Sequence, residues 1–366
     1  MTETVYTAIT FAPVQGFIEK SRKLRDLYGS SFLLSYLAKS ICEAAHRYYH
    51  YQPDVSPKSE DPIVSPALIN LTQGTPNQII IVGDKPFPKT EAKAAFDRPW
   101  KAVVRACRDH IENILIENIP PEEDRNKYQG KFCWSRNWEA WENHGWEFFH
   151  AEGKTIQNVR HNMNETKRSR DWTGINWVGE SSTLSGADAI AWNGMEDQMH
   201  PKTAKVGEID QKIGEFYRDL SSTLGESIID ATEQLSIPEL IKRLITLDEV
   251  SGKLNLTPNQ LPSVEIPHSF VDINRKKENP EDNCWTGWFQ GDGDKIGDYL
   301  KAMAESSANS EQDVLHDFSG AMMNWGKNLK YTLPAATQPQ ETSPSARSPG
   351  PIRRRLPPPP NARTAS

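Results

Sequence analysis

The chain has 366 residues, of which 37% are hydrophobic and 25% are charged, and this length allows two or three domains with a sizeable core. No run approaches the roughly 18 apolar residues of a membrane helix, and no basic segment followed by an apolar one opens the sequence, so we expect no membrane association and a cytoplasmic address. The formal net charge of -7 at pH 7 means that any contact with nucleic acid must use local basic patches.

The first predicted elements are a strand and a helix. β-Branched and aromatic residues over Val5 to Phe11 indicate the strand, and one apolar side indicates a helix from about Gln15 to Tyr28. Gly29 is expected to end this helix, and Ser30 or Ser31 is expected to cap a second helix that runs to about Tyr48.

Two short strands and a long helix come next. Turn-forming residues separate the strands, Pro66 to Leu71 and Gln78 to Val82, and thus predict a hairpin. The helix is predicted over Thr90 to Glu117, with Pro99 as a position that could kink or split it. This order predicts an α+β fold whose first domain, residues 1–130, is a ferredoxin-like unit without a clear final strand.

A mostly helical middle region is predicted over residues 131–270. Closely spaced tryptophans and phenylalanines over Lys131 to Phe149 indicate an aromatic helical core. The polar stretch from Glu152 to Asp171 predicts a loop, and Val206 to Ile245 is predicted to be mostly helical.

Strand character returns at Trp285 to Phe289, within a third region at residues 271–333. A helix with an apolar side is predicted to follow from Ile296. Residues 334–366 are rich in Pro, Ser, Arg and Thr, so we expect a disordered tail that is foreign to the preceding sequence.

The sharpest chemical signal is Asp292 and Asp294, in the segment Gly291 to Gly297 between a predicted strand and a predicted helix. In extended backbone, residues two apart point the same way, so both carboxylates can face one Mg²⁺, which in turn organises nucleotide phosphates. The alternative is a simple turn. A calcium loop is excluded, because Met303 occupies the position of its final glutamate.

A second candidate is Gly29-Ser30-Ser31 at the expected helix start. Free N–H groups and the positive end of a helix dipole make such a start suitable for phosphate. Plain N-capping is the alternative. The neighbouring run of Arg22, Lys23 and Arg25 suits RNA or nucleotide phosphates, or else forms a solvated face.

Several segments together resemble a known family. The run from Phe11 to Ser35, which holds Arg-Lys-Leu-Arg-Asp-Leu-Tyr-Gly-Ser-Ser, resembles the opening of the first palm domain in the large subunit of type III-B CRISPR complexes. Pro76 to Ile80, Ser182 to Gly186 and Gly291 to Gly297 are similar to further landmarks of that family, in the expected order. Gln78 stands where the family has arginine.

This resemblance implies a function. In the family, the second palm resembles nucleotidyl-cyclase palms and joins ATP into cyclic oligoadenylates when the complex binds target RNA. Asp292 and Asp294 would then hold Mg²⁺, and Gly29, Ser30 and Ser31 would contribute to a composite ATP pocket. The implied partners are the other complex subunits, with CRISPR RNA and target RNA bound through the complex.

The sequence departs from the family at the second palm. The expected Gly-Gly-Asp-Asp hairpin does not occur, so we expect a shortened second palm, an incomplete metal site and no cyclic oligoadenylate synthesis by this chain. No residue is assigned a catalytic role. A purely scaffolding or RNA-binding subunit is the alternative. A free-standing cyclase would also require the missing hairpin.

Overall fold

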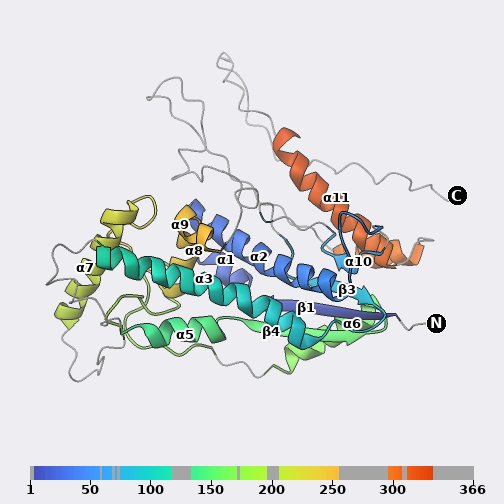
Figure 1. Ribbon diagram of the computed structural model, residues 1–366, viewed down its shortest axis with the longest axis horizontal. Helices are drawn as coiled ribbons and strands as arrows, with labels where there is room; N and C mark the ends of the chain where they lie inside the picture. The colour runs from blue at the N-terminus through green and yellow to red at the C-terminus, as the bar shows by residue number, and fades with distance from the viewer. Residues whose placement is uncertain are drawn as a thin grey trace, which may run out of the picture.

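The structure is a computed structural model that describes residues 4–57, 60–67, 71, 75–117, 133–170, 174–195, 206–254, 296–306 and 311–332. Its centre is an antiparallel sheet of four strands in the order β2-β3-β1-β4 (Figure 1). The strands are β1 (Val5–Ala12), β2 (Ile63–Ser65), β3 (Ile79–Gly83) and β4 (Glu147–Gly153).

The connections make this sheet a complete ferredoxin-like unit. Helices follow β1. Strands β2 and β3 come next, with no described helix between them, and helices again precede β4. The expected α+β class is confirmed. The final strand, which the sequence did not reveal, is β4, which pairs with β1 from Tyr6 opposite Gly153 to Ala12 opposite Glu147. The unit therefore extends past the expected boundary at residue 130.

One face of the sheet carries the main hydrophobic core. Helices α2 (Leu24–Tyr48) and α3 (Lys89–Glu117) cover this face, with the short α1 (Gln15–Glu19) before them and α5 (Ser135–His144) beside α3. Because side chains alternate along a strand, Ile9 and Phe11 point into this core, while Ala8 points to the other face.

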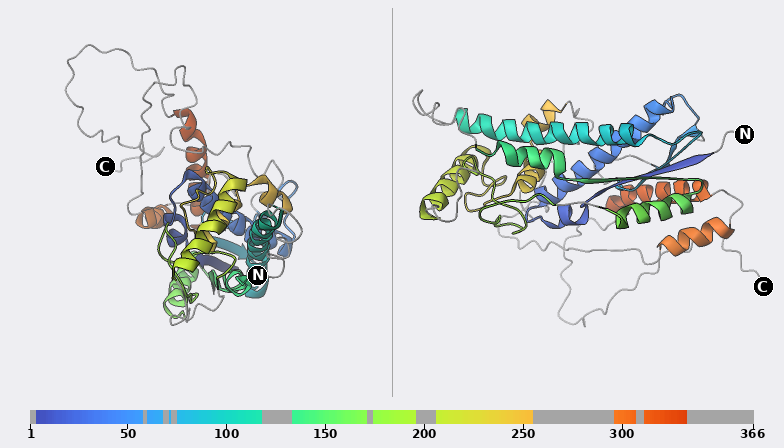
Figure 2. Two further views of the ribbon diagram at one scale, coloured as in Figure 1. Left: turned by 90° about the vertical axis from the view of Figure 1, so that its left-hand side faces the viewer. Right: turned by 90° about the horizontal axis from the view of Figure 1, so that it is seen from below.

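The opposite face is covered by three helices from later in the chain. They are α6 (Ile156–Arg168), α10 (Ile296–Ser306) and α11 (Glu311–Thr332), seen below the sheet in the right-hand view of Figure 2. Leu315 packs with Val64, Ile80 and Ile156. The Tyr6 hydroxyl donates to Gln312 Oε1 at 3.4 Å, so α11 contacts the first strand of the chain.

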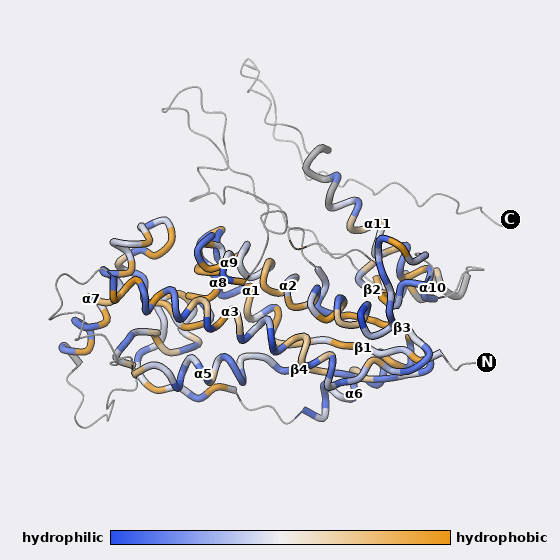
Figure 3. The backbone as a smooth tube through the Cα atoms, viewed as in Figure 1, coloured by the Kyte–Doolittle hydropathy of each residue, from blue (hydrophilic) through white to orange (hydrophobic). Residues whose placement is uncertain are grey.

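Helices α7 (Val206–Leu224), α8 (Ile237–Leu244) and α9 (Asp248–Lys253) extend the core past the end of the sheet. Every residue of α8 is buried, between α2 on one side and α3 and α5 on others. Figure 3 shows apolar residues along this packed region and a largely hydrophilic α6. None of the described helices is long and apolar enough to span a membrane.

Three local expectations were wrong. The first hairpin strand lies at Ile63–Ser65, because Pro66 has no N–H to continue the ladder. The aromatic segment turns from helix α5 into strand β4. The expected loop is helix α6, in which Thr155 Oγ1 accepts from the Asn158 N–H at 3.1 Å and only Ile156, Val159 and Met163 are buried.

Other expectations are confirmed. The strand over Val5 to Phe11, the strand over Gln78 to Val82 and the helix over Thr90 to Glu117 all form, and α3 continues through Pro99. Helices α7, α8 and α10 confirm the expected helices after 206 and from Ile296. The expected strand over Trp285 to Phe289 and the tail over 334–366 lie outside the described residues.

Candidate functional site

The predicted phosphate site, Gly29-Ser30-Ser31, lies inside a helix. α2 runs without a break from Leu24 to Tyr48, so the expected helix end at Gly29 is wrong. Ser30 is fully buried, and its hydroxyl donates to the Asp26 carbonyl at 2.6 Å. These three residues therefore lack the free N–H groups on which we based nucleotide binding, and they do not fit a phosphate cradle here.

Gly29 serves close packing between helices. A Cβ atom at Gly29 would lie 1.9 Å from the Lys242 carbonyl oxygen of α8, well inside any tolerable contact. The absence of a side chain therefore lets α8 lie directly on α2.

The chain breaks instead at residues 20–23, between α1 and α2. Asp26 Oδ2 accepts the backbone N–H groups of Arg22 at 2.9 Å and Lys23 at 2.8 Å. An acidic side chain in the first turn satisfies N–H groups that the helix itself cannot pair, and it interacts favourably with the helix dipole. Asp26 thus fixes where α2 begins.

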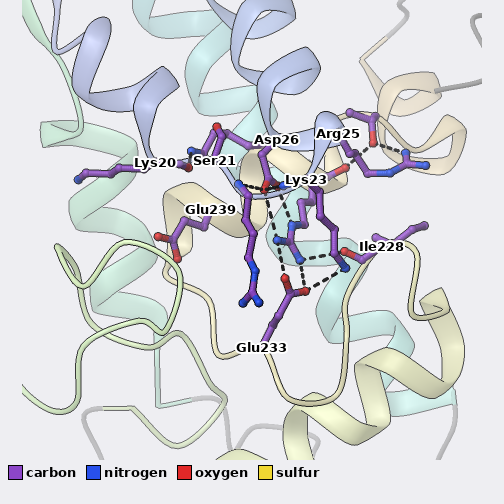
Figure 4. Close-up of polar contacts among 12 residues, drawn as sticks. Lys20, Ser21, Lys23, Arg25, Asp26, Ile228, Glu233 and Glu239 are labelled. Carbon is purple, nitrogen blue, oxygen red and sulfur yellow. Dashed lines mark hydrogen bonds and ion pairs between the residues drawn. The ribbon is translucent and has the colours of Figure 1, made fainter. Parts of the chain in front are cut away.

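Arg243 of α8 pairs with Asp26 in the centre of this region. Figure 4 shows Asp26 with Lys23 and Glu233 beside it. Its Nε donates to Asp26 Oδ1 at 2.7 Å and its Nη2 to Asp26 Oδ2 at 3.3 Å. The other donors reach Glu233 Oε2 at 2.5 Å, Glu233 Oε1 at 3.1 Å and the Ile228 carbonyl at 3.0 Å. All five N–H donors of the guanidinium are therefore satisfied.

Burial and charge act against each other on this arginine. Arg243 and Asp26 are both 0% exposed. Burial alone would lower the pKa of Arg243, but the hydrogen bonds and charges of Glu233 and Asp26 raise that pKa above its ordinary value. Burial would raise the pKa of Glu233, and Arg243 more than offsets this effect and lowers it. Arg243 and Glu233 therefore stay charged, and Arg243 pairs with both carboxylates.

Two lysines complete the buried charge network, which we define as Lys23, Asp26, Glu233, Lys242 and Arg243. Lys23 Nζ lies 3.0 Å from Glu233 Oε2 and donates to the Glu226 carbonyl at 2.9 Å. Lys242 Nζ donates to the Phe17 carbonyl at 3.0 Å and also to the carbonyl of Lys20. Burial lowers the pKa of Lys242 to about 8.

The basic run from Arg22 to Arg25 is therefore mostly used inside the protein. Arg25 is buried as well, with its Nη1 donating to Thr246 Oγ1 at 2.5 Å. Only the Arg22 side chain is exposed. The sequence predicts either phosphate contact or a solvated face for this run. Both predictions are wrong for Lys23 and Arg25, which pair inside the protein.

Ser182 to Gly186, another segment of the resemblance, braces the start of α8. The Ser182 hydroxyl donates to Glu239 Oε1 at 3.1 Å, and Glu239 Oε2 accepts the Ser236 N–H at 2.7 Å. The Thr183 N–H donates to the Gln234 carbonyl at 2.8 Å. Gly186 has a φ of 67°, the left-handed conformation that closes this turn.

Sequence reasoning missed Glu233, Lys242 and Arg243. The spacing of Ser236 and Glu239 matches a capping box and could have located the start of α8. Nothing local indicates that Arg243 pairs with Asp26, because 217 positions separate them.

The predicted metal ligands, Asp292 and Asp294, lie outside the described residues, so their distance from Ser30 stays a prediction. Within the ranges that the structure describes, no group of three or more His, Cys, Asp or Glu side chains is arranged to hold a metal ion.

Comparison with known proteins finds one family model that matches part of this chain. The family described as "CRISPR-associated protein Cmr2, N-terminal" matches residues 6–115, which hold β1 to β3, α2 and most of α3. No curated protein matches the sequence.

A solved chain described as "Type III-B Cmr-beta Cryo-EM structure of the Apo state" is similar at 14% identity with a TM-score of 0.40. The similarity covers 69% of this chain and 32% of that one, so this chain spans about a third of its length. The family model matches residues 6–115, less than half of this chain, and for this part it confirms the resemblance to the large subunit of type III-B CRISPR complexes.

Proposed function

We propose that this chain acts as a subunit of an RNA-guided type III-B CRISPR effector complex, in which residues 6–115 form a rigid palm-like support. One observation carries the proposal. The residues of the family-like segment Arg22 to Ser31 are used to fasten α2 to α8, through Arg243 at Asp26 and the Lys242 carbonyl at Gly29. A segment used in this way stabilises a scaffold and does not present a ligand-binding loop.

Assembly tests this function directly. The tagged full chain is co-expressed with the remaining subunits of a type III-B complex and a CRISPR RNA, and the purified material is separated by size. We expect the chain to elute with the other subunits and the RNA. Elution of a folded chain apart from an otherwise assembled complex would contradict the proposal.

Cyclic oligoadenylate synthesis from ATP and Mg²⁺ is the second candidate function. It is favoured by the position of Asp292 and Asp294, which directly precede α10 in the sequence. Helix α11, which contacts α10, packs on the sheet through an Ala67 N–H that donates to Ser319 Oγ at 3.0 Å. The carboxylates would hold Mg²⁺, which would organise the triphosphate of ATP.

Mass spectrometry of ATP reactions decides between the two candidates. The chain by itself is expected to make no adenylate rings above an Asp292→Ala control, because one carboxylate pair leaves a two-metal site incomplete. Rings formed by the parent chain and lost in Asp292→Ala would favour catalysis over a purely scaffolding role.

A further inference from the structure

A second basic run lies on α6, on the sheet face opposite α2 and α3. Residues 154–170 hold five lysines or arginines (Lys154, Arg160, Lys167, Arg168 and Arg170) against one acidic residue, Glu165. This local excess stands out in a chain whose formal net charge is -7. It is the kind of local patch that an acidic protein needs in order to contact a polyanion.

Helical spacing brings three of these side chains together with His161. We define the basic stripe as Arg160, His161, Lys167 and Arg168, two adjacent pairs that lie two turns apart on α6. His161 and Arg168 are exposed, and Arg160 and Lys167 are half-buried. The buried side of the helix is formed by Ile156, Val159 and Met163, so His161 and Arg168 face away from the sheet, whereas Arg160 and Lys167 lie at the edge of the buried side.

The stripe has little internal pairing. Within the described ranges, the side chains of Arg160, His161 and Lys167 make no ion pair or hydrogen bond. Arg168 lies 2.8 Å from Glu165, but their side chains are 77% and 54% exposed, and such a surface pair contributes little. The charges of Arg160, Lys167 and Arg168 are therefore available to an external anion.

Stabilisation of helix α6 explains only some of the positive side chains in the stripe. Lys167 and Arg168 lie in the last turn, where positive charge interacts favourably with the helix dipole. Arg160 and His161 lie in the middle of the helix, beyond the reach of that effect. The helix dipole therefore does not account for Arg160 and His161.

The carboxylates at the start of α11 and the end of α6 lie at opposite ends of this sheet face. Burial, together with the charges of Glu311 and Asp313 at the start of α11, raises the pKa of Tyr6, so these carboxylates lie near the beginning of β1. Arg170, just after α6, lies 3.6 Å from Glu147, which is opposite Ala12 at the end of β1. The carboxylates of α11 are therefore remote from the C-terminal half of the stripe and do not neutralise it.

We propose that the basic stripe of α6 binds the phosphodiester backbone of a single-stranded nucleic acid. Arg160 and Lys167 are seven residues apart, about 10 Å along a helix, so the stripe is long enough to contact more than one phosphate of a strand. Contacts of this kind position a strand without reading its sequence. The inference adds a direct contact by this chain to the proposed assembly, and it stands on the charge distribution alone.

Fluorescence anisotropy on the isolated full chain tests the proposal, with labelled uridine and deoxythymidine homopolymers as probes, between about 50 and 200 mM salt. The variant is Arg160→Gln/Lys167→Gln/Arg168→Gln. Its matched control, Arg47→Gln/Lys89→Gln/Arg98→Gln, removes the same charge from exposed positions on the opposite layer. Loss of three phosphate contacts should lower the salt slope by about 2 and weaken binding about a hundredfold at 0.1 M salt, while the control binds as the parent does.

Several outcomes would overturn the proposal. Equal losses in both variants would mean that net charge, and not this stripe, governs binding. Unchanged binding in the stripe variant would refute the contact. A stripe variant that binds RNA normally but fails to elute with the complex would make the stripe a protein-docking surface. Unfolding midpoints of both variants check that the fold is intact, and because the test uses the isolated chain, its failure is distinct from failure of assembly.

Discussion

Two basic runs of similar composition have different surroundings in this protein. Arg22 to Arg25 opens α2 and lies against Asp26, Glu233 and α8, where the pair of Asp26 and Arg243 is fully buried. Arg160 to Arg168 lies on exposed and half-buried positions of α6, where the ion pair of Arg168 and Glu165 is largely exposed. Apart from Arg22, the cations available to a partner are those of the second run.

The difference shows that burial and distant acids decide the role of a basic run. A buried ion is strongly destabilising unless it is paired and hydrogen-bonded. The first run meets this condition because Lys23 pairs with Glu233 and the Glu226 carbonyl, and Arg25 donates to Thr246. The second run has no such partners among the described residues, so its charges remain in contact with solvent.

Removing one buried partner should have the largest effect. Arg243→Leu leaves Asp26 and Glu233 buried without their cation, so we expect the free energy of unfolding to fall by about 3 to 5 kcal/mol. Urea unfolding followed by circular dichroism measures this loss. Arg168→Leu on α6 is the matched control and should change stability by at most about 0.5 kcal/mol. Similar losses in both variants would remove the distinction between the two runs.

Helix packing at Gly29 should give the next largest effect. Gly29→Ala puts a Cβ against the Lys242 carbonyl and should destabilise the fold by about 1 to 3 kcal/mol. Gly214→Ala in α7, where nothing lies within 4 Å of the new atom, should instead stabilise by up to about 1 kcal/mol. Thermal unfolding compares the two. A neutral or stabilising Gly29→Ala would mean that α8 does not lie directly on α2.

Lys242 should make a smaller contribution to the free energy of unfolding, and this contribution should depend on pH. Its pKa falls from 10.5 in the unfolded chain to about 8 in the fold, so between these values the unfolded state binds more protons and stability rises with pH. Relative to Lys242→Met, the parent should gain about 1.4 kcal/mol per pH unit within that window. Unfolding of both proteins at pH 8 and 9.5 measures the gain. A constant difference between them would show that the pKa of Lys242 is not lowered.

The sequence predicts elements well where apolar spacing is regular. β1 and α3 have such spacing, and both formed close to their expected bounds. α6 has three buried positions in thirteen residues, too few to distinguish it from a loop. β4 follows α5 after two residues, so its alternating aromatics were included in one helical segment.

The site was harder to predict for a different reason. Gly29 suggested a helix end because glycine often ends helices, but here it permits contact with a backbone 213 residues later in the chain, at Lys242. The roles of Lys23 and Arg25 depend on Glu233 and Thr246, which no local pattern connects to them. The resemblance identified the right segment, whereas its physical role required the tertiary partners.

The most direct test of the buried charge network is a double-mutant cycle between Asp26 and Arg243. The unfolding free energies of Asp26→Asn, Arg243→Gln and the double variant give the coupling energy of the pair. Because both groups are buried and hydrogen-bonded, we predict a coupling of about 2 kcal/mol or more, against less than about 0.5 kcal/mol for the same cycle at Glu165 and Arg168. A coupling near zero at Asp26 and Arg243 would contradict the account, because the first basic run would then be no more structural than the second.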